Sequence, residues 1–303
     1  MPTLETPLGS ITAMEGAEFY GTGALRSCIA IDESPLLTGY GTLIPQFSSN
    51  SVRKRQLPSL SFHENGMPRT LPLEEQVTIT TPLGVLPAEK VTFYPDGAVK
   101  RIFPLNGCLS GYWELKDEIR LASPLNIDTP CGPMKKRLIS LYFGPHGNLK
   151  SLTFWPGERI KVKAPLGPIS VRVGLAFYDS GQIKSLEPAV PVAIKTPIGE
   201  VVAFDPDALG ITGDQNSLRF DEAGNIMSLV TVSSSFNITT PDKTIRKIES
   251  PTRLNPVDGE TREPTPMTVT FKEGKTFFSA SGMAEFSAPY AAIQTKGLLP
   301  LFG

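Results

Sequence analysis

The sequence predicts an all-β protein made of tandem β-hairpin repeats, which form an elongated or curled antiparallel sheet of the solenoid type. Three observations indicate this fold. One glycine-containing string recurs six times, a second string alternates with it, and 27 glycines plus 29 prolines make 56 of the 303 residues. That share, about 18%, exceeds the ~12% of an average protein and is typical of a chain rich in turns. The segment 109–121 is the one candidate for a helix.

The first string is Phe-x-x-x-Gly. Its copies are Phe19–Gly23, Phe62–Gly66, Phe93–Gly97, Phe143–Gly147, Phe177–Gly181 and Phe220–Gly224. In Tyr94-Pro95-Asp96-Gly97, proline suits the second position of a type I turn and glycine the left-handed position after it. This order predicts a three-residue hairpin loop with a bulge at the glycine. Counting outward places Phe93 opposite Val99, so we expect the phenylalanines to pack in the core.

The second string is Thr/Ala-Pro-x-Gly, preceded by alternating apolar residues. Its copies are Thr6–Gly9, Thr81–Gly84, Thr129–Gly132, Ala164–Gly167 and Thr196–Gly199. The same turn chemistry predicts a second hairpin with the same loop, and the alternation predicts strands of period two. The shortest unit of two hairpins, from Ala164 to Thr196, is 32 residues long. About seven degenerate units of this kind fill residues 1–250.

Longer spacings between copies mark three insertions, at residues 48–57, 104–122 and 205–215. Repeat proteins confine insertions to loops, often on one binding face. Residues 251–266 are rich in proline and charge, which predicts a linker or long loop. Residues 267–303 are then a terminal hairpin and a capping tail. Val99 and Ile102 are expected on opposite faces of the sheet, so both faces would need cover.

The hairpins Phe93-Tyr-Pro-Asp-Gly97-Ala-Val-Lys100 and Phe177-Tyr-Asp-Ser-Gly181-Gln-Ile-Lys184 resemble the looser bacterial variants of MORN-type repeats. The resemblance covers about half of each unit, and the Thr-Pro-x-Gly hairpin has no counterpart in MORN repeats. It implies an elongated antiparallel sheet that acts as a scaffold, with protein or phospholipid partners. It carries over no catalytic residue.

Composition narrows the class of protein. The chain has 29 Lys+Arg against 30 Asp+Glu, a formal net charge of −1, which argues against a nucleic-acid partner. No apolar run approaches the ~18 residues of a membrane span, and Met1–Glu5 does not read as a signal peptide. We therefore expect a cytoplasmic protein that needs no cofactor.

Histidine and cysteine offer little chemistry in this sequence. His63 and His146 both occupy variable turn positions, where a structural role is the simpler interpretation. Cys28 replaces a buried aliphatic residue of the repeat, and Cys131 lies in a Pro-x-Gly turn. Cys108, in the insertion 104–122, is the one cysteine outside the repeat register.

Three groups of residues are candidate sites. A basic row follows the first string at equivalent positions and would face anionic lipid or simply solvent: Arg26, Arg69, Lys100, Lys150 and Lys184, with Arg219 opposite Met227 in the sixth copy. Aromatic residues outside the repeat register are the usual anchors of a protein interface; they are Tyr112 and Trp113 in the insertion 104–122, and Trp155, which follows Phe154 in a repeat strand. Asp205, Asp207 and Asp214 share a short loop and are weak candidates for a metal, although calcium-loop spacing is missing.

These features favour a non-catalytic repeat scaffold or binding module that offers its sheet face and insertions to a protein partner. The alternative from another class is a carbohydrate-active or other hydrolase that uses carboxylates from the insertions. A third option is attachment to an anionic membrane surface through the basic row. An enzyme would have a deep pocket where acids converge, whereas a scaffold would present broad, shallow surfaces.

Overall fold

The computed structural model describes residues 1–49, 51–107, 109, 112–210 and 213–297. The chain is all-β, with 54% strand and 3% helix, and its strands pair antiparallel. It divides into two compact units, Met1–Trp155 and Pro156–Gly303. This division differs from the expected boundaries at 250 and 266, because it follows contacts between distant segments that turn patterns do not record.

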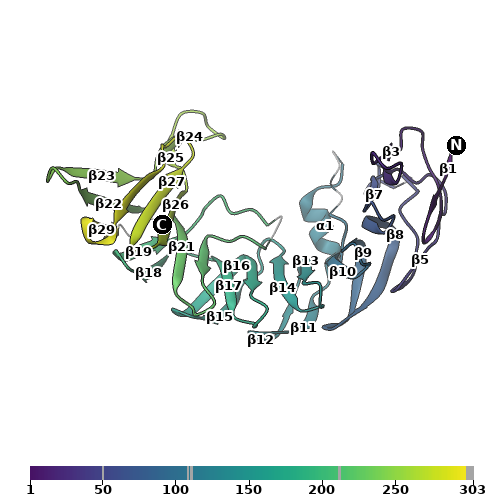
Figure 1. Cartoon of the computed structure of the whole chain (residues 1–303), viewed down its shortest axis with the longest axis horizontal. Coiled ribbons are helices and arrows are strands. Elements are labelled where there is room, and N and C mark those ends of the chain that lie inside the picture. Colours follow the sequence, from purple (N-terminus) through teal and green to yellow (C-terminus); the bar gives the residue numbers. More distant parts are fainter. Residues whose placement is uncertain (50, 108, 110–111, 211–212, 298–303) are drawn as a thin grey trace. The chain divides into compact units, whose positions relative to one another are not determined.

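The first unit contains an eight-stranded run of one antiparallel sheet (Figure 1). In spatial order its strands are β3 (Glu18–Phe19), β4 (Leu25–Cys28), β7 (Leu60–Phe62), β8 (Pro68–Thr81), β9 (Gly84–Phe93), β10 (Val99–Phe103), β13 (Leu138–Phe143) and β14 (Leu149–Phe154). Three separate two-stranded hairpins accompany it: β1 (Thr3–Thr6) with β2 (Gly9–Thr12), β5 (Leu36–Thr38) with β6 (Gly41–Leu43), and β11 (Leu125–Thr129) with β12 (Gly132–Lys136). The helix α1 (Leu115–Leu121) lies within the insertion 104–122, as the sequence suggested.

The second unit has a seven-stranded run, in the order β16 (Gly167–Phe177), β17 (Ile183–Pro188), β20 (Leu218–Phe220), β21 (Ile226–Thr231), β26 (Met267–Lys272), β27 (Lys275–Ala280) and β28 (Phe286–Pro289). Beside it lie β15 (Ile160–Ala164), which pairs with β16, the hairpin of β18 (Val192–Thr196) and β19 (Gly199–Ala203), and the three strands β23 (Ile245–Glu249), β22 (Ser234–Thr239) and β29 (Ile293–Gly297). A 3-10 turn, η1 (Tyr290–Ala292), separates β28 from β29.

The segment 251–266 is not only a loop. It contains a short hairpin of β24 (Thr252–Leu254) and β25 (Arg262–Pro264), in which Arg253 Nε donates to Glu263 Oε1 at 2.7 Å. This ion pair joins the two strands across a loop of charged residues. Following that hairpin, β26 pairs with β21, so the terminal hairpin continues the sheet of the second unit.

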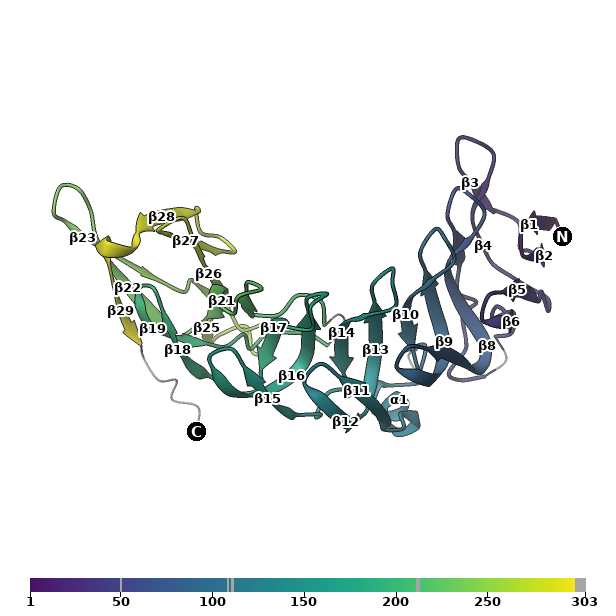
Figure 2. The same cartoon turned by 60° about the horizontal axis from the view of Figure 1, so that its bottom comes forward.

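Each Phe-x-x-x-Gly string forms a hairpin with the predicted register. Phe93 pairs with Val99, and the other five strings show the equivalent pair. Gly97 has a φ of +86°, the left-handed conformation that the turn requires. Figure 2 shows the loops of these hairpins in the first unit side by side, all at the same end of their strands.

A bulge in every one of these hairpins overturns the expectation of two apolar faces. The register skips one residue after the first pair, so Ile102 faces Val91 while Val99 faces Phe93. Phe93 and Val91 are two residues apart on one strand and share a face. The bulge therefore brings Val99 and Ile102 to that same face, and the other face carries polar residues such as Thr92 and Arg101.

The Thr-Pro-x-Gly hairpins are tighter than expected. Thr81 pairs directly with Gly84, which leaves a two-residue loop without a bulge. The Thr81 hydroxyl supports the tight turn, because Oγ1 donates to Gly84 O at 2.8 Å and accepts from Leu83 N at 3.1 Å. Ala164 forms the same two-residue loop with Gly167 and has no hydroxyl, so the hydroxyl is not required for it.

The core lies between the apolar sheet face and these smaller hairpins. Phe93 is 2% exposed, and Phe143 and Phe177 are equally buried. The two kinds of turn are also in contact. Gly147, in a Phe-x-x-x-Gly turn, lies so close to Pro82, in a Thr-Pro-x-Gly turn, that a Cβ added to Gly147 would lie 2.8 Å from Pro82 Cγ. Phe19 is the exception at 52% exposed, because β3 is the edge strand of its sheet.

Successive hairpins are joined by side-chain hydrogen bonds to a backbone carbonyl. The Tyr20 hydroxyl donates to Phe62 O at 2.8 Å, and Tyr94 donates to Phe143 O at 2.9 Å. Tyr178 makes the same bond to Phe220 O in the second unit. His63 occupies the tyrosine position in its own hairpin, where Nε2 bonds to Phe93 O at 3.1 Å. Its role is thus structural, as the turn position suggested.

Candidate functional site

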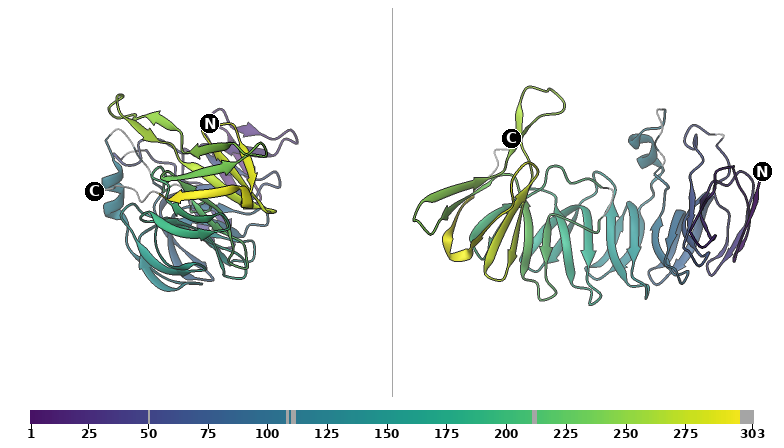
Figure 3. Two further views of the ribbon diagram at one scale, coloured as in Figure 1. Left: turned by 90° about the vertical axis from the view of Figure 1, so that its left-hand side faces the viewer. Right: turned by 45° about the horizontal axis from the view of Figure 1, so that its top comes forward.

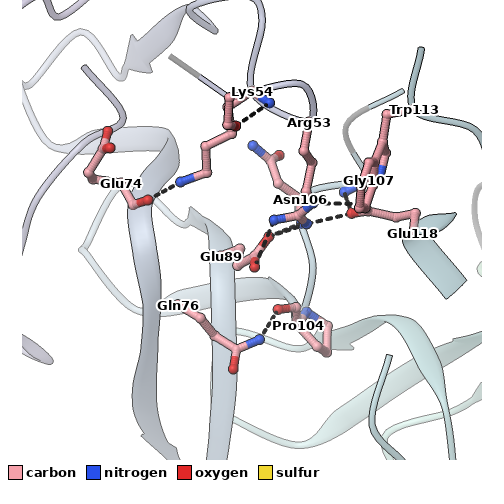
Figure 4. A network of polar contacts seen from close by, with 11 residues as sticks. Arg53, Lys54, Glu74, Gln76, Glu89, Pro104, Asn106, Gly107, Trp113 and Glu118 are labelled. Carbon is pink, nitrogen blue, oxygen red and sulfur yellow. Dashed lines mark hydrogen bonds and ion pairs between the residues drawn. The ribbon is translucent and has the colours of Figure 1, made fainter. Parts of the chain in front are cut away.

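The insertion 104–122 is held to the sheet of the first unit by Arg53, whose side chain is 12% exposed (Figure 4). Arg53 donates from Nε to Glu118 Oε2 at 2.7 Å and from Nη2 to Glu118 Oε1 at 2.5 Å. It also donates to both carboxylate oxygens of Glu89, at 3.1 and 2.6 Å. Arg53 comes from the insertion 48–57, Glu89 from β9 and Glu118 from α1. Two insertions that lie far apart in the sequence are therefore clamped together.

The two carboxylates of the clamp are buried, and each of their four oxygens accepts a hydrogen bond from Arg53. Glu118 is 0% exposed and Glu89 is 8% exposed. Hydrogen bonds from Arg53 to Glu118 and Glu89 raise the pKa of the guanidinium above its ordinary value. Bidentate arginine–carboxylate pairs are among the strongest polar contacts in proteins, but they stabilise only when every member is satisfied.

Backbone N–H groups and an indole N–H also donate hydrogen bonds to these carboxylates. Trp113 Nε1 donates to Glu118 Oε2 at 2.8 Å and Gly107 N donates to Glu118 Oε1 at 3.2 Å. Asn106 N donates to Glu89 Oε2 at 2.9 Å, and Gln76 Nε2 to Pro104 O at 2.9 Å. The insertion is consequently fixed at its start and along α1.

The outer surface of the insertion carries four large apolar side chains. Leu109 is 60% exposed, Tyr112 73%, Leu115 43% and Leu121 47%. The Arg55 guanidinium lies 4.4 Å from the centre of the Tyr112 ring, a cation–π contact. We name these four apolar residues, with Arg55, the insertion surface. Glu118 is buried, whereas the charged side chains of Glu114, Lys116 and Arg120 share the solvent side of the insertion with its leucines. The helix α1 stands clear of the strands of the first unit (Figure 3, right).

The three predicted aromatic anchors differ in their exposure to solvent. Tyr112 is exposed on the insertion surface, and Trp113 is half-buried and tied to the clamp. Trp155 is 3% exposed, so it is not the surface anchor that we expected. It directly follows a run of buried residues at the end of β14, and its position outside the turn string gave no sign of that burial.

The basic row occupies the bulge position of each hairpin. In the first unit Arg26, Arg69, Lys100 and Lys150 stand on β4, β8, β10 and β14. These strands are two apart in the sheet, which spaces the cations by roughly 10 Å. The row is therefore evenly placed, and its role toward anionic lipid stays a prediction.

In the second unit the row continues only in part. Lys184 occupies the bulge of its hairpin and lies 5.7 Å above the Tyr178 ring. Arg219 pairs with Ser228 instead of Met227, because Met227 is itself the skipped residue of the bulge. Arg219 thus stands on the first strand of the hairpin, where the other copies carry their basic residue on the second.

The three aspartates of the insertion 205–215 do not form a metal site. Asp207 N donates to Asp205 Oδ1 at 2.9 Å, and the Asp207 carboxylate pairs with Arg253 at 2.8 Å. Within the described ranges no three His, Cys, Asp or Glu side chains are grouped to hold a metal. Cys28 is buried, and this burial raises the pKa of its thiol to about 11. Cys108 lies outside the described residues.

Sequence reasoning also missed a third buried carboxyl, Glu187 on β17. It is 2% exposed, and it accepts hydrogen bonds from Ser217 N at 2.9 Å and Ser217 Oγ at 2.8 Å. Burial raises the pKa of Glu187 to about 7, even though the Ser217 bonds act to lower it. No signal in the sequence distinguished this glutamate from other strand residues.

The raised pKa of Glu187 makes stability depend on pH. The folded protein holds this proton up to about pH 7, while the unfolded chain releases it near pH ~4.3. The free energy of unfolding therefore falls as pH rises between these values, by roughly 3 kcal/mol from this group. We expect Glu187→Gln to remove that slope. Urea titrations across this range measure it, with the exposed Glu200→Gln as control. A slope that persists in Glu187→Gln would contradict the assignment.

Comparisons with known proteins add no identity. No family model matches the chain, and no curated protein matches it. Among the described residues, no helix has the length and apolar character needed to cross a bilayer.

Proposed function

We propose that this protein is a non-catalytic, cytoplasmic binding module, a repeat scaffold that presents the insertion surface to a protein partner. The insertion carries this proposal, because it leaves three leucines and Tyr112 exposed to water, and large apolar side chains gathered in one exposed segment mark interaction sites. Exposed Cys131 and buried Cys28 are free thiols, which fits a reducing compartment.

The chemistry of the insertion surface suits a protein partner. Tyrosine, arginine and large aliphatic residues are the side chains that dominate protein interfaces. Tyr112 and Arg55 are already stacked, so less conformational entropy is lost when a partner covers them. The Arg53 clamp fixes the backbone beneath, which makes the surface rigid before binding.

The scaffold part of the proposal is a tandem array of hairpins, similar to MORN-type repeats, in an elongated or curled sheet. The shared register of six hairpins and the tyrosine hydrogen bonds between neighbours support it. In such an array each unit contacts its neighbours, and insertions project without disturbing the sheet.

The test is capture of a partner from a lysate of the source organism with the full chain as bait. Tyr112→Ala combined with Leu115→Ala should abolish capture while leaving the unfolding transition unchanged, because both side chains are exposed. The matched control combines Leu37→Ala with Val85→Ala, which removes two side chains that are 69% and 63% exposed in the same unit. A partner bound equally by both double variants would overturn the proposal, and so would a bait that captures no protein.

A further inference from the structure

A cavity of about 420 Å³ opens on the polar side of the second unit. Residues of β16, β17, β20 and β21 line it together with the insertion 205–215 and the segment that follows. Its polar lining comprises Glu187, Asp205, Asn216, Arg219, Ser228 and Thr268. The cavity lies within one unit and far along the chain from the insertion surface, so it is independent of the function proposed above.

One side chain in this cavity has an unmet hydrogen-bonding need. Asn216 is 8% exposed, and its Nδ2 donates to Ser185 Oγ at 2.8 Å and to Gly213 O at 3.0 Å. Its Oδ1 is buried and has no hydrogen-bond partner in the described part of the chain. A buried acceptor without a donor costs free energy. This oxygen faces Gly174 and has almost no accessible surface, so a ligand donor reaches it only when the cavity wall shifts.

The backbone beside Asn216 is shaped to admit the amide. β16 has a bulge between Arg172 and Leu175, and Val173 there has a φ of +56°, which is rare for a β-branched residue. At Gly174 a Cβ would lie 2.2 Å from Asn216 Oδ1, so only glycine leaves room for it. Strain of this kind persists where the surroundings impose it, commonly at ligand sites.

The charges of the lining are of both signs. Glu187 is buried and Asp205 lies close enough to influence its ionisation. Arg219 is exposed and lines the cavity on the solvent side. Arg172 is already engaged, since it donates to Pro188 O at 3.3 Å and to Asp205 O at 2.5 Å. Arg219 is therefore the cation with which a ligand anion would pair.

We propose that this cavity binds a free α-amino acid. An ammonium group has three N–H donors and no acceptor, which suits the two carboxylates of the lining, Glu187 and Asp205. The ligand carboxylate pairs with Arg219, assisted by the hydroxyls of Ser228 and Thr268. Leu209 and Val230 form the apolar wall for the ligand side chain, so an aliphatic amino acid fits best.

This assignment implies pH dependence of binding. The ammonium pairs with ionised Glu187, so affinity should rise as pH increases from about 6 to about 8, through the raised pKa of that carboxyl. The charged groups that surround it are Asp205 and Arg172, with Asp207 and Arg253 acting on Asp205 and Arg219 on the solvent side.

The experiment is calorimetric titration of the full chain at about pH 8 with L-leucine, at ligand concentrations up to about 10 mM. N-acetyl-L-leucine lacks the ammonium and L-leucinamide lacks the carboxylate, and neither should bind. The remaining standard amino acids are titrated in the same way, to find the preferred side chain. Arg219→Gln should weaken binding at least about tenfold, since it removes a charged hydrogen bond. Lys195→Gln, an exposed strand lysine of the same unit outside the cavity, is the matched control.

A folding check and one further variant keep the test decisive. Arg219 is exposed, so its replacement should leave the fold intact, which circular dichroism verifies. Gly174→Ala should abolish binding, because the new methyl displaces Asn216. The proposal is overturned if no standard amino acid binds, if the two blocked leucines bind as well as leucine, or if Arg219→Gln binds like Lys195→Gln. Partner capture by the insertion surface is measured separately, so either proposal can fail alone.

Discussion

Phe93→Ala should lower the free energy of unfolding of the first unit by about 3–5 kcal/mol. The ring is 2% exposed and lies 6.2 Å, centre to centre, from the ring of Tyr40. Its removal leaves a cavity between the sheet and the smaller hairpins, which the two-residue turns cannot close. Urea unfolding followed by tryptophan fluorescence measures the change, since both tryptophans belong to this unit.

Phe19→Ala is the matched control for that experiment. Phe19 occupies the same position of the same string, but it is 52% exposed at the sheet edge, so its loss should cost less than about 1 kcal/mol. Equal costs at the two positions would show that the phenylalanines do not form the core row.

Arg53→Met should destabilise the insertion 104–122 by about 3–5 kcal/mol, because it leaves Glu89 and Glu118 buried without a countercharge. Hydrogen exchange of the described insertion residues, together with urea unfolding, detects the loss whether it is local or global. The triple variant with Glu89→Gln and Glu118→Gln removes the unpaired charges and should recover part of the stability.

The control for the clamp is Arg120→Met. Arg120 pairs with Asp117 at 3.5 Å, and its side chain is 76% exposed, so the change should cost less than about 1 kcal/mol. An Arg53 variant as mild as this one would contradict the view that the clamp holds the insertion in place.

The hairpins were predictable because their information is local. Turn residues set the loop, and counting outward from Gly97 gives the observed pair of Phe93 with Val99. The turn residues do not reveal that the bulge after Val99 shifts the alternation of side chains by one residue. The prediction that Ile102 lies on the face opposite Val99 is therefore wrong. The Pro-x-Gly pattern also does not reveal the two-residue loop, which forms both with the hydroxyl of Thr81 and, at Ala164, without one.

The clamp and the cavity were beyond sequence reasoning because their members meet only in the folded chain. Arg53 lies in the insertion 48–57, and its partners Glu89 and Glu118 lie 36 and 65 residues away in the sequence. Asp205 was noted as a metal candidate, yet its neighbour in the cavity is Glu187, a strand residue. The prediction of Tyr112 as an exposed aromatic rested on its place outside the repeat register, and exposure there is confirmed.

The tyrosine bond between neighbouring hairpins has an evolutionary consequence. Four hairpins carry a side-chain donor directly after their phenylalanine, and the acceptor is the phenylalanine carbonyl of the next hairpin, as Tyr94 and Phe143 show. Because that acceptor is a backbone atom that every copy supplies, a gene that gained or lost one whole hairpin after such a donor would still bring donor and acceptor together. Insertion or deletion of residues should therefore be tolerated far better at the junctions between hairpins than inside a hairpin, where it would shift the strand register.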